Sequence, residues 1–253
     1  MSDYVNLKVK DVVRETPDAV TIQFKQPLFR KVKYKPGQFL TLILDIDGQK
    51  VRRSYSMSSS PTLDNHVGIT VKRIEDGLVS NYVNENISKG DSIEIMRPMG
   101  NFTVDTDKDK QRHLVLIGGG SGITPLMSIM KSILFFEPNS MVSLVYANRN
   151  EKSVIFKEKI DELKEKFDER FNVVHILEKP EQMTNGYTGR LTPEMMVNIN
   201  NLLPRLDGET EYFICGPEGM MDVAKEGLKM SKVPKSRIYT ESFVASENDS
   251  AAL

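Results

Sequence analysis

Residues 118–125 have the types and order of an anion-binding turn. They read Gly-Gly-Gly-Ser-Gly-Ile-Thr-Pro, follow a short apolar run and precede a stretch with helical periodicity. Glycines let a backbone approach a ligand closely, and the N–H groups at a helix start attract anions. Thr124 would cap this helix, and Pro125 would occupy its first position. The pattern predicts a pyrophosphate over Gly120, Ser121, Gly122, Thr124 and Pro125, with a tight turn that binds nothing as the alternative.

The end of the next strand-like run, Asn148-Arg149, bears on which dinucleotide would bind. In doubly wound nucleotide-binding folds, an acidic residue at this place binds the ribose 2′-hydroxyl, whereas an arginine suits a 2′-phosphate. A charge-assisted hydrogen bond contributes about 1.5–3 kcal/mol, so Arg149 alone would favour NADPH by about 10- to 100-fold. The alternative is a solvated arginine at a strand end. We therefore expect NADPH, with NADH possible.

Cys215-Gly216-Pro217 follows another apolar run, at the edge of the sheet where ligands collect. A lone buried thiol usually packs as a small apolar group. With one cysteine, the chain cannot form an internal disulfide or hold an iron–sulfur cluster through four of its own cysteines. The three histidines, His66, His113 and His175, have no companions at metal-ligand spacing, so no metal site is predicted.

The first hundred residues have the pattern of short β-strands. Runs rich in Val, Ile, Thr and Tyr are separated by turn pairs such as Pro36-Gly37, Asp47-Gly48 and Asp76-Gly77. Six strands at this spacing, with one helix-like stretch near residues 79–83, predict a small antiparallel barrel. The predicted strands cover residues 4–13, 19–24, 39–46, 51–57, 67–74 and 92–96.

From Leu114 the pattern changes to short apolar strands that alternate with amphipathic helices. Such alternation predicts a parallel sheet with helices on both faces. A charged stretch at 105–112 separates the two patterns, so we predict domains at residues 1–107 and 108–253. The predicted strands cover residues 114–117, 142–146, 173–177 and 212–214, and the predicted helices cover 125–134, 155–167, 193–199 and 219–230.

Composition excludes some classes of partner. Among 253 residues, 34 Lys and Arg oppose 35 Asp and Glu, which leaves a formal net charge of −1. Nucleic acids and anionic membranes require a basic surface, so neither is expected as the main partner. No apolar run approaches the roughly 18 residues of a membrane span, and residues 1–10 lack the pattern of a signal peptide. We expect a cytoplasmic protein.

Five motifs occur in order along the chain: Arg53-Ser54-Tyr55-Ser56, Gly77-Leu78-Val79-Ser80, the glycine-rich turn, Cys215-Gly216-Pro217 and Glu241-Ser242-Phe243. Together they resemble the flavoprotein reductases of the ferredoxin–NADP reductase superfamily, over nearly the whole chain. Residues 146–149 and 188–190 resemble the reductase subunits of multicomponent oxygenases, such as the phenylacetyl-CoA epoxidase system. The resemblance implies a six-stranded antiparallel Greek-key β-barrel that binds FAD, followed by a five-stranded parallel α/β sheet that binds NADP.

The resemblance also implies roles for residues of the barrel. Arg53 would pair with the FAD pyrophosphate, for which a guanidinium is well shaped. Tyr55 would lie against the isoalloxazine, and Ser56 would form a hydrogen bond near its N5 atom. Residues Gly77, Val79 and Ser80 would bring N–H groups and a hydroxyl to the pyrophosphate at a helix start. The other barrel residues assigned to the cofactor are Ser54, Val71, Lys72 and Leu78.

At the sheet edge the resemblance implies residues around the nicotinamide. Phe243 would cover the flavin face opposite Tyr55 and yield to nicotinamide, and Cys215 and Glu241 would lie close to it. With Ser56, these three are the candidate catalytic residues. Phe156 would stack on adenine, although plant-type relatives carry there a tyrosine that helps bind the 2′-phosphate. The remaining nucleotide-binding candidates are Asn148, Ser153, Gly216 and Pro217, with Gly186-Tyr187 and Arg190 as further phosphate ligands.

The implied activity is that of an FAD-dependent reductase, which passes hydride from NADPH to FAD and then single electrons to a ferredoxin or other iron–sulfur partner. Three alternatives stay open. The chain could be an NADH-dependent reductase of a haem protein or quinone, an FAD-binding electron-transfer subunit of a larger complex, or a non-catalytic nucleotide-binding module.

One departure from the subgroup lies at the end of the chain. Oxygenase reductases of this kind usually continue into a ferredoxin-like domain with four cysteines, which this sequence does not contain. Either the acceptor is a separate protein or the chain is part of a longer one. An acidic ferredoxin could dock on the basic cluster Arg30, Lys31, Lys33 and Lys35, which could equally be ordinary surface.

Overall fold

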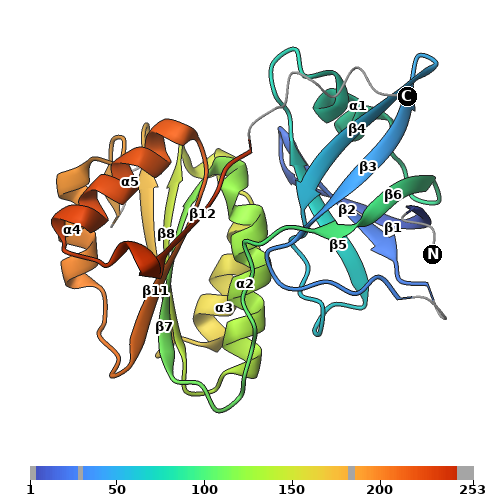
Figure 1. The fold of residues 1–253 in the computed structure, drawn as a ribbon. Helices are drawn as coiled ribbons and strands as arrows, with labels where there is room; N and C mark the ends of the chain where they lie inside the picture. Colours follow the sequence, from blue (N-terminus) through green and yellow to red (C-terminus); the bar gives the residue numbers. More distant parts are fainter. Residues whose placement is uncertain (1–3, 28–30, 182–185, 244–253) are drawn as a thin grey trace.

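The computed structural model describes residues 4–27, 31–181 and 186–243. A barrel of antiparallel strands forms the first half of the chain, and a layered α/β structure forms the second (Figure 1). The charged linker runs between them at the side of helix α2, Ile123–Phe136. The two halves have the fold classes that the change in sequence period predicts.

The barrel has six antiparallel strands in the order β4-β3-β6-β1-β2-β5. A bridge between Met57 and Ile69 brings the two edge strands together, and the Asp47-Gly48 hairpin turn has positive φ at both residues, as a two-residue hairpin requires. Helix α1, Leu78–Asn86, follows β5 where a helix was expected. The strands are β1 Tyr4–Thr16, β2 Ala19–Lys25, β3 Phe39–Ile46, β4 Gln49–Ser56, β5 His66–Lys72 and β6 Ser92–Met99.

The second sheet is parallel throughout, in the order β10-β9-β8-β7-β11-β12. Six described strands form it, so the expected number of five was wrong. The edge strand β10 has only two residues, which is too short for a periodic pattern in the sequence. The strands are β7 Arg112–Gly119, β8 Met141–Asn148, β9 Phe171–Leu177, β10 Tyr187–Thr188, β11 Glu209–Cys215 and β12 Ile238–Glu241.

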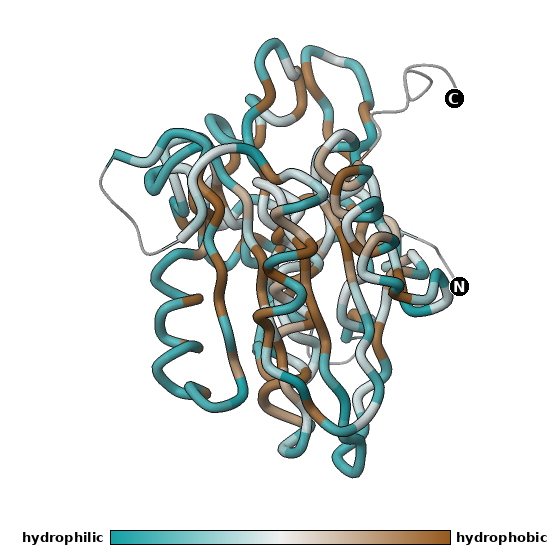
Figure 2. The backbone as a smooth tube through the Cα atoms, turned by 90° about the vertical axis from the view of Figure 1, so that its left-hand side faces the viewer, coloured by the Kyte–Doolittle hydropathy of each residue, from teal (hydrophilic) through white to brown (hydrophobic). Residues whose placement is uncertain are grey.

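Helices cover both faces of this sheet. Helices α2 and α3 (Lys157–Lys166) lie on the side toward the barrel, and α4 (Pro193–Leu202) and α5 (Glu218–Met230) lie on the other (Figure 1). Strand β7 is buried along its whole length, as expected for the centre of a covered parallel sheet, and hydrophobic colour follows the central strands in Figure 2. Among the described residues, no helix has both the length and the apolar character to span a bilayer.

The barrel has its own apolar core, and a few residues of the first part of the chain also join the core on the α2 face of the sheet. Ala19 at the start of β2 and the linker residues Phe102 and Val104 pack into the cluster that lies beneath α2 and α3. The linker is also held by Arg112, whose guanidinium donates to the Asp105 carbonyl at 2.9 Å and to the Glu137 carboxylate at 2.7 Å. These contacts hold the segment between the two halves against the α2 side of the sheet, and Arg112 holds it at the amino end of β7.

Candidate functional site

The glycine-rich turn joins β7 to α2 at the carboxyl edge of the sheet. Residues Gly120–Gly122 form one 3-10 turn, and Gly120 adopts a φ of +52°, which favours glycine. The hydroxyl of Tyr146, at the end of the neighbouring strand β8, donates to the Gly120 carbonyl at 2.9 Å. Sequence reasoning assigned Tyr146 no site role, because a tyrosine inside an apolar strand resembles core.

The expected cap of α2 was wrong. The helix begins at Ile123, so Thr124 and Pro125 are its second and third residues, and the Thr124 hydroxyl donates to the Ser121 carbonyl at 3.0 Å. Pro125 is tolerated because the first helical residues have no intrahelical acceptor for an N–H group. No described side chain caps the helix start at Gly122, which leaves its N–H groups for an anion.

The ends of β7 and β11 touch across this turn. A Cβ atom added to Gly122 would lie 2.1 Å from the carbonyl oxygen of Cys215 and 2.7 Å from the nitrogen of Gly216. Gly216 likewise lies against Gly119, and Pro217 begins helix α5 as its N-cap. The structure therefore brings the glycine-rich turn and the Cys-Gly-Pro motif into one site.

Strand β12 adds Glu241 to the same edge. Cys215 and Glu241 are register partners, and the Cys215 side chain is fully buried. Burial raises the pKa of the Cys215 thiol far above its ordinary value, and the nearby Glu241 carboxylate raises it further; burial also raises the pKa of Glu241. A thiol held protonated is a packing group beside the site. Phe243 follows two residues later, and its side chain is 47% exposed.

In the barrel, β4 presents the four motif residues on alternate faces. Arg53 and Tyr55 share one face, and burial raises the pKa of Tyr55 to about 12. Ser56 is 5% exposed on the other face, where the Ser54 hydroxyl contacts that of Thr41 at 2.8 Å. The strand therefore places a ring and a guanidinium side by side, as a flat, anionic ligand would require.

The start of α1 forms a second glycine-based cradle. A Cβ atom at Gly77 would lie 2.6 Å from the Ser80 hydroxyl, and no described side chain caps this helix. Ser80 accepts from the Ile74 N–H at 3.1 Å and donates to the Gly77 carbonyl, so its hydroxyl already closes the loop. Val71 and Val79 are barrel core, so they offer a ligand only their backbone, whereas Leu78 is 55% exposed.

Lys72 joins the two halves of the site. It ends β5 and forms an ion pair with Asp18 at 3.5 Å. Its Nζ atom also lies 3.9 Å from the position that a Cβ of Gly120 would occupy. The end of the barrel strand that precedes α1 is thus beside the glycine-rich turn of the α/β half.

The end of β8 holds an unsatisfied amide. Both Oδ1 and Nδ2 of Asn148 are buried and form no hydrogen bond with described residues, which is costly unless a ligand completes them. Arg149 is exposed beside it.

The Ser153 hydroxyl is engaged in a capping box with Asn150. Phe156 packs in the core with 8% of its side chain exposed, which leaves little ring surface for adenine.

The other candidates are more scattered. Arg190 is exposed and pairs with Glu178 at 3.1 Å, and Lys35 pairs with Asp105 at 2.8 Å. Arg30 of the basic cluster lies outside the described residues. Within residues 4–27, 31–181 and 186–243, no group of three or more His, Cys, Asp or Glu side chains could hold a metal ion.

A cavity of about 460 Å³ opens at the edge of β9, between α3 and α4. Its lining includes Tyr187 and His175 but no residue of the glycine-rich turn or the Cys-Gly-Pro motif. The space therefore does not mark where those two motifs meet.

Comparisons with known proteins match both halves. Residues 6–104 match the model of the oxidoreductase FAD-binding domain, and residues 116–226 match that of the oxidoreductase NAD-binding domain. The chain is 36% identical over 245 residues to a component of the 1,2-phenylacetyl-CoA epoxidase of Escherichia coli K12, covering 96% of this chain and 68% of that protein. The chain belongs to the ferredoxin reductase-like family of oxidoreductases.

Further relatives agree with this assignment. The oxidoreductase is 40% identical over 248 residues to the ferredoxin reductase component of the 3-ketosteroid-9-alpha-monooxygenase of Rhodococcus rhodochrous, covering 97% of this chain and 66% of that protein. Its fold matches the ferredoxin NADP+ reductase of Neisseria gonorrhoeae with a TM-score of 0.78 at 22% identity, covering 96% and 99% of the two chains. The oxidoreductase spans about two thirds of the length of these two curated relatives.

Proposed function

We propose that this oxidoreductase takes reducing equivalents from NADPH and, through FAD, supplies electrons to an iron–sulfur protein of an oxygenase system. The observation that carries the proposal is the junction at Lys72, which lies beside the glycine-rich turn at the end of a barrel strand. Electrons can pass from a pyridine dinucleotide to a flavin only where the two bound ligands lie close together. The barrel motif and the glycine-rich turn must therefore be neighbours. The contact at Lys72 supports such a meeting place.

The residues present fit both cofactors. Four of the five described α-helices lack a side-chain cap, and at two of these starts, Gly77 and Gly122, the N-cap is a glycine where a Cβ would collide with neighbouring atoms. Such starts suit the two pyrophosphates of FAD and a pyridine dinucleotide. The unpaired amide of Asn148 is a further polar group that a ribose or a phosphate could complete.

Bound FAD would supply the redox chemistry, since it can receive two electrons together and release them singly. The chain's own residues bind, orient and shield. Arg53 would hold the phosphate by charge, Tyr55 would face the ring, and Ser56 would offer a buried hydroxyl near it. Cys215 stays neutral because its pKa is raised, so it adds no charge next to the nicotinamide.

The preference for NADPH rests on Arg149 and is tested by Arg149→Ala. We expect its affinity for NADPH to fall about 10- to 100-fold, and its affinity for NADH to change less than about twofold. Arg237→Ala is the matched control, because it removes a guanidinium that pairs with Glu209 at the amino ends of β11 and β12, away from the glycine-rich turn. Titration of the purified variants with each coenzyme measures both affinities. Equal losses for the two coenzymes would show that Arg149 does not bind the 2′-phosphate.

The role of Phe243 is tested by Phe243→Ala. Its exposed ring lies two residues beyond Glu241, so truncation should alter nicotinamide affinity and the ratio of activities with NADPH and NADH. Tyr239→Ala is the control, since Tyr239 lies on β12 four residues before Phe243, is 40% exposed and stacks on Phe213. Unchanged kinetics in Phe243→Ala would remove this residue from the nicotinamide site.

The identity of the electron acceptor is tested with a panel of candidate acceptors. Anaerobic protein is titrated with NADPH and NADH while flavin absorbance is followed, and then mixed with ferredoxin, a haem protein or a quinone. The proposal expects bleaching by NADPH and the fastest reoxidation by the ferredoxin. Faster reoxidation by the haem protein or the quinone would overturn the proposed partner. Flavin that neither coenzyme bleaches would identify an electron-transfer subunit instead.

A further inference from the structure

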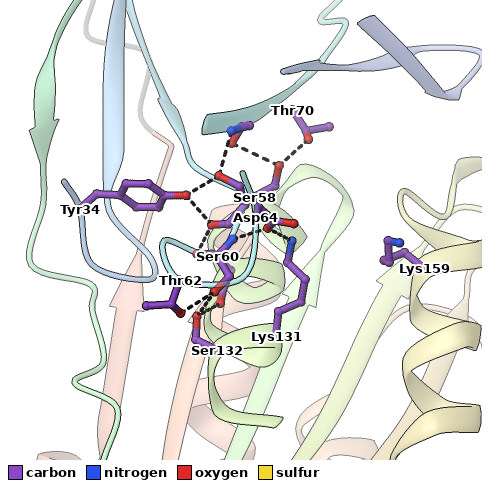
Figure 3. A network of polar contacts seen from close by, with 12 residues as sticks. Tyr34, Ser58, Ser60, Thr62, Asp64, Thr70, Lys131, Ser132 and Lys159 are labelled. Atoms are coloured by element: carbon purple, nitrogen blue, oxygen red, sulfur yellow. Dashed lines mark hydrogen bonds and ion pairs between the residues drawn. The ribbon is translucent and has the colours of Figure 1, made fainter. Parts of the chain in front are cut away.

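One face of helix α2 is polar although it is buried against the barrel. Ser128, Lys131 and Ser132 are spaced three and four residues apart, so they lie on the same side of the helix. This side meets the serine-rich loop at residues 58–60 and Asp64, which follow strand β4 (Figure 3). The exposed fractions of Ser128 and Ser132 are 0% and 1%.

The contacts across this junction are direct and short. The Ser128 hydroxyl donates to the Ser59 carbonyl at 2.6 Å. The Ser132 hydroxyl donates to the Ser128 carbonyl at 2.8 Å, so Ser60 is the donor in the 2.9 Å contact between the hydroxyls of Ser60 and Ser132. Each hydroxyl therefore donates its hydrogen bond in a defined direction, and this fixes how the loop lies against α2. Apolar side chains of the same size would not fix that orientation.

An ion pair closes the same junction. Lys131 Nζ lies 2.5 Å from Asp64 Oδ2, with 13% and 23% of the two side chains exposed. The same carboxylate oxygen accepts from the Ser60 N–H at 2.6 Å. Asp64 thus holds the loop in the shape that presents Ser60 to α2.

The loop is fixed to the barrel from its other side. The Tyr34 hydroxyl contacts the Ser59 hydroxyl at 2.5 Å, and the Ser58 hydroxyl contacts that of Thr70 on β5 at 3.0 Å. The loop is consequently anchored to two barrel segments and, through Ser128, Lys131 and Ser132, to α2. We call these last three residues with Ser59, Ser60 and Asp64 the serine clamp.

The serine clamp lies between the two halves of the candidate site. Ser56 precedes the loop by two residues, and the glycine-rich turn precedes Ser128 on α2. Six residues of helix from Gly122 to Ser128 span about 9 Å, so a tilt of α2 by about 10° at the clamp would move the turn by roughly 1.5 Å. Displacements near 1 Å can reduce reaction rates about 100-fold.

We propose that the serine clamp is a positioning element, which sets the distance between the flavin site on the barrel and the nucleotide turn on α2. This inference rests on the proposed function, because the distance matters only if electrons pass between the two sites. None of the clamp residues is assigned to contact either cofactor. Their effect on the rate is transmitted by α2 and by the loop.

The test uses the double variant Ser128→Ala/Ser132→Ala in the purified, flavin-containing full chain. Alanine is a good helix former, so α2 itself is preserved. The matched control is Ser143→Ala, which removes a buried hydroxyl that contacts His113 Nε2 at 2.8 Å inside the α/β half. Both variants lose buried hydrogen bonds, but only the double variant loses them between the two halves.

Two readouts distinguish positioning from stability. Steady-state reduction of an artificial acceptor is followed over a range of NADPH concentrations, and amide hydrogen exchange is measured without nucleotide. We expect kcat in the double variant to fall about 10- to 100-fold with KM within about threefold of wild type, and exchange at residues 120–123 to accelerate. Ser143→Ala should keep the wild-type kcat and the wild-type exchange at the turn, even with a lower melting temperature.

Each result decides the inference. A double variant that keeps kcat within about twofold of wild type overturns the clamp's positioning role, whatever its stability. If neither NADPH nor NADH reduces the flavin of the wild-type protein, the proposed function fails. The serine clamp is then tested by hydrogen exchange at residues 120–123 alone. In that case, equal exchange at residues 120–123 in the double variant and in Ser143→Ala overturns it.

Discussion

A methyl group at Gly122 would separate the ends of β7 and β11, which form the proposed nucleotide site. The φ of Gly122 is −61°, so alanine is compatible with the backbone and the effect is purely one of space. The added Cβ would lie 2.1 Å from the Cys215 carbonyl oxygen, and the three nearest atoms all belong to the backbone of Cys215 and Gly216. No flexible side chain can move aside to relieve the contact.

The size of the effect can be worked out from that distance. Ordinary van der Waals contact begins near 3.4 Å, so the turn and the Cys-Gly-Pro motif must move apart by about 1.3 Å. A displacement of about 1 Å can cost about 100-fold in rate. We therefore expect Gly122→Ala to lower kcat/KM with NADPH by about 100-fold. The FAD content should be unchanged, because the proposed flavin contacts lie on the barrel.

The assay is steady-state reduction of an artificial acceptor, with flavin content read from absorbance. Gly219→Ala is the matched control, because Gly219 lies in the first turn of α5 and a Cβ there meets no atom within 4 Å. This control should keep wild-type activity and gain about 0.5–1 kcal/mol of stability, as alanine favours a helix. A Gly122→Ala protein with kcat/KM within twofold of wild type would refute the close-approach argument.

Three other tests concern buried polar groups. Asn148→Leu should raise the melting temperature without nucleotide, because a buried unpaired amide costs about 1–3 kcal/mol, and should weaken NADPH binding in a titration. Glu137→Ala should lower the urea-derived free energy of unfolding by about 1–3 kcal/mol, since it removes one of the two carboxylates that pair with the Arg112 guanidinium and leaves only Glu211, whereas Lys157→Ala at an exposed pair should change it by less than about 0.5 kcal/mol. Cys215 should react with a thiol reagent at pH 8 only after unfolding. Burial raises the pKa of the Cys215 thiol in the folded protein above the ordinary 9.0. Above pH 9.0 the thiol of the unfolded chain therefore loses its proton while the folded one keeps it. The contribution of the neutral, buried thiol to folding stability is consequently present at neutral pH and is lost as the pH rises above that value.

Patterns of local sequence predicted most of the fold. The Asp47-Gly48 pair marked a hairpin because both residues tolerate positive φ, and the apolar run before the glycine-rich turn marked β7 because a central parallel strand is buried on both faces. Strands β10 and β12 escaped prediction because two and four residues are too few to show a period. The start of α2 escaped because a 3-10 turn precedes it, so Thr124 is already inside the helix.

The site was less predictable than the fold, because residue type does not specify a partner. Ser153 has the chemistry of a phosphate ligand, but its hydroxyl is part of a capping box. Phe156 is a plausible stacking ring, but it adopts a φ of +63° and packs in the core. The approach of Lys72 to Gly120 joins positions far apart in the chain, and no local pattern encodes such a distance.

Helix α2 connects these observations, because each part of it is held by a different section of the molecule. Its start carries the glycine-rich turn, and its middle is tied to the barrel loop by Ser128 and Ser132. Its end is held by Arg170, which donates at 2.7 Å to the carbonyl of Leu134, one of those that a helix end leaves unpaired, and at 3.0 and 2.9 Å to the carbonyls of Glu137 and Ser140 that follow the helix. A helix fixed at its end and along one face can move its start only by breaking buried polar contacts. If the proposed flavin and nucleotide sites are correct, their separation is set in the protein before any cofactor binds, which would reduce the ordering required before electrons can pass.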